Sequence, residues 1–126
     1  MGIDENQILG ILRIAHDTSM RGQGLSLSDA LQRSDYDRLR RAFSSSDLVP
    51  CLRANPELTK QWIMYCEDKR TSGGFWVTED SFEVGSVESP QSTERYGAIE
   101  EAVAVFVVRE LDYWSQLRRL RTRQSS

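Results

Sequence analysis

The stretch NPELTKQWIMYCEDKRTSGGFWVTEDSFEVGSVE, residues 55–88, decides the fold. Asn55 is a favourable cap for a helix that starts at Pro56, where the missing proline amide would have no helical partner anyway. Apolar residues then recur at helical spacing and predict a buried stripe: Leu58, Trp62, Ile63 and Cys66. Cations at positions 69 and 70 suit the last turn, and the sequence SGG at 72–74 ends the helix.

Two short alternating runs follow this helix, FWVT from residue 75 and FEVGSVE from residue 82. Phe75 and Val77 recur at period two, as do Phe82 and Val84, and the pattern predicts an antiparallel hairpin packed on helices. Trp76 falls on the opposite face of the hairpin. It either packs into a covered core or offers an anchor for a partner.

Helical patterns precede this stretch. Asp4 and Gln7 have the spacing of a capping box, which predicts a helix over residues 4–17. A connector rich in glycine then leads to a short helix over residues 26–31.

The segment that leads into Asn55 is expected to hold one more helix and a turn. Ser34 and Asp37 have the spacing of an N-terminal cap for a helix over residues 36–43. Pro50 would remove a helical hydrogen bond, so we expect a short turn rather than a full helix around it.

A long amphipathic pattern over residues 96–120 predicts a C-terminal helix, with a buried strand over 103–108 as the alternative. Glu110 lies within its apolar face. It is either a buried acid, or the core contact ends near Phe106, or an arginine pairs with it. The basic residues 121–126 are expected to fray.

The 126 residues, 39% of them hydrophobic and 28% charged, are typical of a globular protein. We predict an α+β fold: one mainly helical domain over residues 1–120, with a small antiparallel hairpin or sheet at about residues 74–88 packed on helices. The sequence has neither a membrane-spanning run nor a signal peptide, so a cytoplasmic location is expected. Cys51 and Cys66 are expected to be thiols, with a disulfide as the alternative.

The residue inventory does not point to catalysis. His16 is the only histidine and lies near a predicted helix end, which leaves no material for a histidine-based metal cluster. The carboxylate pairs Glu67 and Asp68, and Glu79 and Asp80, are adjacent in sequence and are expected to point in different directions, so they do not predict a paired-carboxylate catalytic site. We expect neither enzymatic activity nor a cofactor nor a metal.

Charge is unevenly distributed along the chain. Residues 74–101 contain seven acids and one arginine, a balance of −6, whereas residues 109–126 have a balance of +3. The acidic segment either attracts a cationic partner or only keeps an exposed hairpin soluble.

A second charged feature gives an alternative function. Arg38, Arg40 and Arg41, together with the basic C-terminal tail, could form a phosphate-binding surface of a regulatory or nucleic-acid-associated module. Asp35 and Asp37 beside them, and a net charge of −3, favour a solvated helix face instead. A small enzyme or ligand binder, with a site beside Trp76, His16 or Cys66, is a third alternative.

The pattern PELxxxWxxYxEDKRTSGGFW, the strand EVGSVE and the helix AIEEAVAVFVVRELD, within about residues 55–115, resemble bacterial immunity proteins. These are the cognate inhibitors of polymorphic or contact-dependent growth inhibition toxins. The resemblance implies a cytoplasmic protein without chemistry of its own that binds one toxin domain and blocks its active site. An acidic face suits this role if the toxin is a basic nuclease.

On this interpretation the partner is a toxin domain, with no membrane or nucleic-acid partner expected and the oligomeric state left open. The expected partner-binding residues lie on the hairpin and at its exit: Trp76, Glu79, Asp80, Glu83 and Glu88.

Overall fold

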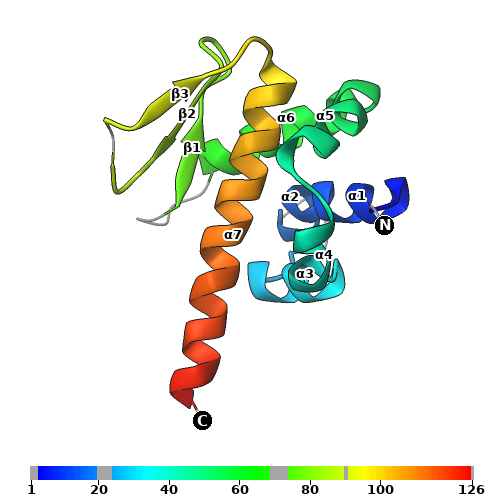
Figure 1. The fold of residues 1–126 in the computed structure, drawn as a ribbon, viewed down its shortest axis with the longest axis vertical. Coiled ribbons are helices and arrows are strands. Elements are labelled where there is room, and N and C mark those ends of the chain that lie inside the picture. The colour runs from blue at the N-terminus through cyan, green and yellow to red at the C-terminus, as the bar shows by residue number, and fades with distance from the viewer. Residues whose placement is uncertain (1–2, 20–23, 69–73, 90, 126) are drawn as a thin grey trace.

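Helix α6 (Pro56–Asp68) forms where the sequence predicted it, in a computed structural model that describes residues 3–19, 24–68, 74–89 and 91–125 (Figure 1). The predicted stripe packs inward, with Cys66 only partly buried. Trp62 is fully buried, and its indole Nε1 donates to the carbonyl oxygen of Leu12 at 2.8 Å. The predictions for residues 69–73 lie outside the described residues.

The side chain of Asn55 does not cap α6 as predicted. Its Nδ2 donates to the carbonyl oxygen of Cys51 at 2.9 Å, so it caps the end of the preceding helix. Pro56 is the first residue of α6, as predicted.

The hairpin is part of a three-stranded antiparallel sheet in the order β1-β2-β3. Its strands are β1 (Phe75–Val77), β2 (Glu83–Ser86) and β3 (Thr93–Arg95). Val77 lies opposite Val84 on the buried face, whereas Trp76 lies opposite Gly85 on the other face. Strand β3 forms in the polar segment after the predicted hairpin.

Helix α7 (Ile99–Ser125) lies between the sheet on one side and helices α1 to α5 on the other (Figure 1). Residues 103–108 are helical, so the strand alternative is wrong. The core along α7 continues beyond Phe106 to Leu111, and the helix extends past its predicted end near residue 120. Together the elements form a mainly helical α+β domain, as predicted, around one hydrophobic core.

The N-terminal pattern forms two helices instead of one, α1 (Glu5–Leu12) and α2 (Ile14–Thr18), which meet at Arg13. The predicted capping box is confirmed, because Asp4 and Gln7 bond to each other's backbone N–H groups at 2.8 and 3.0 Å. Helix α3 (Leu27–Arg33) is capped by Ser26.

The predicted cap at Ser34 is wrong. Its hydroxyl donates back to the carbonyl oxygen of Leu31 at 3.0 Å, so Ser34 ends α3. The next helix, α4 (Tyr36–Leu39), starts after Asp35 in a left-handed conformation with φ 62°. A 3₁₀ turn, η1 (Arg40–Ala42), follows it.

The short turn predicted around Pro50 is also wrong, because this segment forms helix α5 (Ser45–Ala54) with the proline inside. The helix starts after Ser44, whose N–H donates to Asp47 at 2.8 Å. Leu48, Cys51 and Leu52 are buried, and α5 packs along α7. This burial offsets the hydrogen bond that the proline removes.

Within the described residues, no helix is long and apolar enough to cross a lipid bilayer.

Candidate partner-binding site

The β1–β2 turn presents two of the predicted partner-binding acids. Glu79 and Asp80 are exposed, and neither makes an ion pair with another described residue. Thr78 holds the turn that carries them. Its N–H donates to the backbone carbonyl oxygen of Glu83 at 2.9 Å, and its hydroxyl oxygen lies 2.6 Å from that of Ser81. The hydrogen bonds hold the backbone of the turn, which presents the two carboxylates at an exposed tip.

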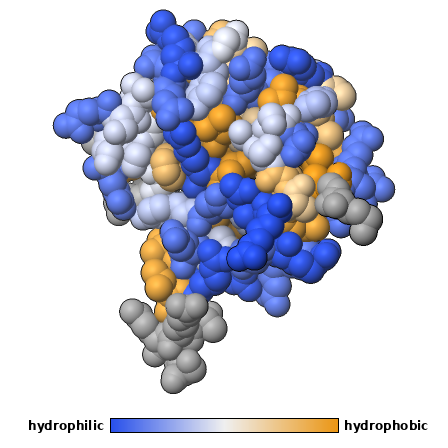
Figure 2. Space-filling model, viewed as in Figure 1, coloured by the Kyte–Doolittle hydropathy of each residue, from blue (hydrophilic) through white to orange (hydrophobic). Residues whose placement is uncertain are grey.

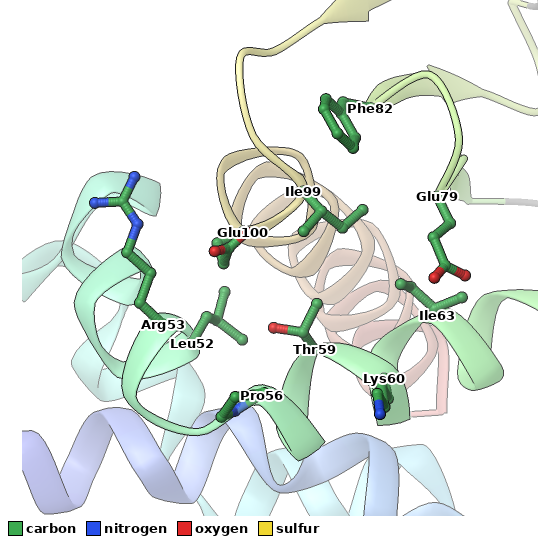
Figure 3. Close-up of a pocket in the computed structure, with 10 residues that line it drawn as sticks. All are labelled: Leu52, Arg53, Pro56, Thr59, Lys60, Ile63, Glu79, Phe82, Ile99 and Glu100. Atoms are coloured by element: carbon green, nitrogen blue, oxygen red, sulfur yellow. The ribbon is translucent and has the colours of Figure 1, made fainter.

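Phe82 ends the turn in a conformation that is rare for a large side chain, with φ 55°. Its N–H donates to the backbone carbonyl oxygen of Thr78 at 3.1 Å, and its own carbonyl oxygen accepts from the backbone N–H of Tyr96 at 3.0 Å. We predicted that Phe82 would alternate with Val84 within the strand. It instead lies before β2 and directs its ring toward α7 (Figure 3).

Trp76 lies on the outer face of the sheet and is half-buried. Its ring covers Gly85 so closely that a Cβ there would lie 2.2 Å from Trp76 Cζ2. Glu83 shares this face and lies 3.7 Å from Arg95 across the β2–β3 pair. Trp76 therefore serves mainly to pack against the sheet, and the exposed part of its side chain lies on the same face as Glu83.

Glu88 lies at the other end of the hairpin from Glu79. Its carboxylate accepts from the Tyr113 hydroxyl at 3.1 Å, which connects it to the middle of α7. The structure thus divides the five predicted residues among the turn, the outer face and the far end, and does not gather them in one cluster.

A pocket with a volume of about 340 Å³ opens beside Glu79 (Figure 3). The end of α5, the first half of α6, the β1–β2 turn and the start of α7 form its walls. Its lining residues are Leu52, Arg53, Pro56, Thr59, Lys60, Ile63, Glu79, Phe82, Ile99 and Glu100.

Thr59 lies at the floor of this Glu79 pocket with only 7% of its surface exposed. Its hydroxyl oxygen is buried and has no hydrogen-bond partner within the described structure. An unpartnered buried hydroxyl is unfavourable by about 1–3 kcal/mol, so a bound group that donated a hydrogen bond to this oxygen would remove that cost. At the rim, Arg53 lies 3.9 Å from Glu101.

Among the lining residues, only Glu79 was predicted to belong to a site, and the pocket itself was not predicted from the sequence. Thr59 and Ile99 are unremarkable positions of two separate helices, and Phe82 seemed to be a strand residue. The acidic doublet at the start of α7 was the only signal near it.

Glu110 is a fully buried acid, which was one of the expected alternatives. Its carboxylate accepts hydrogen bonds from the Tyr65 hydroxyl at 2.9 Å, the Phe75 N–H at 2.9 Å and Trp114 Nε1 at 2.8 Å. Burial, and then the negative charge of Glu110, raise the pKa of Tyr65 well above its usual range. These hydrogen bonds join α6, β1 and α7, so Glu110 stabilises the packing of the sheet on the helices.

The arginines of the alternative functional surface differ in exposure. Arg38 and Arg41 are exposed as expected, and Arg38 pairs with Asp35. Arg40 is only partly exposed, because its Nε donates to Asp112 at 2.8 Å and a second nitrogen donates to the backbone carbonyl oxygen of Phe43 at 3.0 Å. On α7, Arg118 and Arg119 lie 3.6 Å from Asp37.

The remaining candidates have local roles. His16 is exposed near the end of α2, as predicted. Cys51 and Cys66 are thiols, which excludes the disulfide alternative, and burial raises the pKa of Cys51. Among the described residues, no group of three or more His, Cys, Asp or Glu side chains could hold a metal ion.

Comparison of the chain with protein-family models, curated proteins and solved structures found no match. The resemblance to immunity proteins therefore stays a prediction that depends on the residues quoted for it.

Proposed function

We propose that this protein is a non-catalytic inhibitor that binds and neutralises a cognate bacterial toxin domain, with the β1–β2 turn at the interface. The observation that carries the proposal is the pair of exposed carboxylates, Glu79 and Asp80, on a turn held by hydrogen bonds. A turn whose backbone is held before binding loses little backbone entropy on association, and its exposed carboxylates steer a cationic partner.

The surroundings of the turn support an interface based on charge. On the face seen in Figure 2, apolar surface is broken into small patches between polar side chains. In the part of the chain that the structure describes, the exposed large hydrophobic residues are scattered over three segments, at Met64, Val87 and Leu120. Trp76 and Glu83 flank the turn on the outer sheet face, whereas Glu88 belongs to a separate surface.

The first test is association with the toxin itself. We expect the gene upstream to encode a large secreted toxin, and its C-terminal domain to copurify with this protein. If neither is found, the inhibitor proposal is wrong.

The second test locates the interface. Glu79→Gln with Asp80→Asn should lower the association rate about three- to tenfold at low salt and weaken its salt dependence. Glu5→Gln with Asp29→Asn removes the same charge from exposed positions of α1 and α3 and should leave the rate nearly unchanged. Equal effects of the two double variants would place the interface elsewhere.

The nucleic-acid alternative has less support, because Arg38, Arg40, Arg118 and Arg119 each lie beside a carboxylate. Tight binding to DNA or RNA with a steep salt dependence would favour that alternative.

A further inference from the structure

We infer that the Glu79 pocket receives a basic side chain, arginine or lysine, of the bound partner. This inference rests on the proposed function, because it names the chemistry by which the toxin domain would be recognised. The pocket adjoins the acidic turn, and Glu79 belongs to both.

The shape and the walls of the pocket suit a long side chain with a charged end. Its volume of about 340 Å³ exceeds what one side chain needs, and the pocket is open to solvent at the rim. Ile63, Phe82 and Ile99 offer apolar surface on which a methylene stem can pack. The left-handed backbone of Phe82 is what brings its ring to this wall.

The charges around the pocket favour a cation. Glu79 and Glu100 line it, and of the two lining cations Arg53 already lies 3.9 Å from Glu101. Figure 3 shows the Arg53 guanidinium directed away from the centre of the pocket. The remaining charged residues that line the pocket are one cation, Lys60, and two carboxylates, Glu79 and Glu100, so the net charge around the pocket is negative.

An anion is the less suitable occupant, although two helices begin here. The N-termini of α6 and α7 would attract one, but acids already occupy their first turns: Glu57 in α6, and Glu100 and Glu101 in α7. Thr59 supplies the remaining recognition, since its buried, unpartnered oxygen can accept a hydrogen bond from a guanidinium or ammonium group.

The test is a nuclear magnetic resonance titration of the ¹⁵N-labelled full chain with N-acetyl-arginine amide. We expect saturable shifts of the amides of Thr59, Phe82 and Ile99, with a dissociation constant of about 1–10 mM. N-acetyl-citrulline amide has nearly the same shape without the charge and should bind at least about fivefold more weakly.

Substitutions assign the contacts. Glu79→Gln with Glu100→Gln should weaken binding of the arginine derivative at least about fivefold, and Thr59→Val should weaken it about threefold or more. Thr59→Ser keeps the hydroxyl and should bind like the parent chain. Spectra without the added compound show whether each variant is folded.

Three outcomes would overturn the inference: equal binding of the citrulline derivative, tighter binding of N-acetyl-glutamate amide, or no saturable shift at the pocket with the arginine derivative. No toxin is present in this experiment. A negative titration with a copurifying toxin would therefore refute the pocket assignment alone, whereas the absence of both an upstream toxin gene and a copurifying toxin domain would refute the inhibitor function.

Discussion

Glu110 offers a sharp test of what holds the sheet to the helices. Its Oε1 accepts from the Phe75 N–H, and its Oε2 accepts from both the Tyr65 hydroxyl and Trp114 Nε1. The change Glu110→Gln keeps the size of the side chain but replaces one of these acceptor oxygens with an NH₂ donor.

Neither orientation of the new amide satisfies all three of the donors described here. If the NH₂ group replaces Oε1, it faces the Phe75 N–H, and two donors oppose each other. If it replaces Oε2, the Tyr65 hydroxyl can rotate to accept, but Trp114 Nε1 can only donate. In either case one charge-assisted hydrogen bond is lost, and its N–H donor, that of Phe75 or of Trp114, is left without an acceptor. This loss corresponds to about 2–4 kcal/mol of stability.

Urea unfolding followed by circular dichroism measures this loss. Glu67→Gln, at an exposed position of α6, is the control and should change the free energy of unfolding by less than about 0.5 kcal/mol. Trp114→Phe should lose about 1–2 kcal/mol, and the two losses should add to more than the double variant shows, because the variants share one hydrogen bond. A Glu110→Gln variant as stable as the control would refute the assignment of these three bonds.

Other positions give further expectations. Gly85→Ala places a Cβ 2.2 Å from Trp76 Cζ2, so it should shift the near-ultraviolet circular dichroism and lower stability by about 1–3 kcal/mol; an unchanged spectrum would contradict this packing. Gly10→Ala, inside α1 with open space around the new methyl group, should raise the free energy of unfolding by about 0.5–1 kcal/mol, and a loss would contradict the helix there. Burial raises the pKa values of Tyr36 and Tyr65 above their usual range, and Asp112 and Glu110 respectively reinforce these shifts. The stability that the two tyrosines contribute is therefore fully present below about pH 10, and it falls at higher pH as the unfolded chain releases these protons. Urea midpoints at about pH 8 and about pH 11 should show this fall, and replacing both tyrosines with phenylalanine should reduce it.

Local signals in the sequence were enough where all of them agreed. The position of Pro56 and the apolar spacing from Leu58 to Cys66 correctly placed α6, and the period-two pattern placed the hairpin. The same holds for Asp4 and Gln7, whose mutual capping depends only on residues one turn apart.

Local signals failed where distant contacts decided the outcome. Pro50 is tolerated because α7 covers the apolar side of α5, and no pattern within residues 45–54 reports that partner. For Ser34, the choice between ending one helix and starting the next depended on the left-handed turn at Asp35.

The sequence by itself determined the mainly helical α+β class, the hairpin and the acidic segment, because these follow from spacing and charge along the chain. Only the tertiary structure decided that Glu110 is buried beside three donors of the described residues, and that Glu79 meets Thr59 and Ile99 around one pocket. The physical reason is the same in both cases. Burial and convergence depend on which elements pack together, and residues from α5, α6, the hairpin and α7 become neighbours only when the core forms.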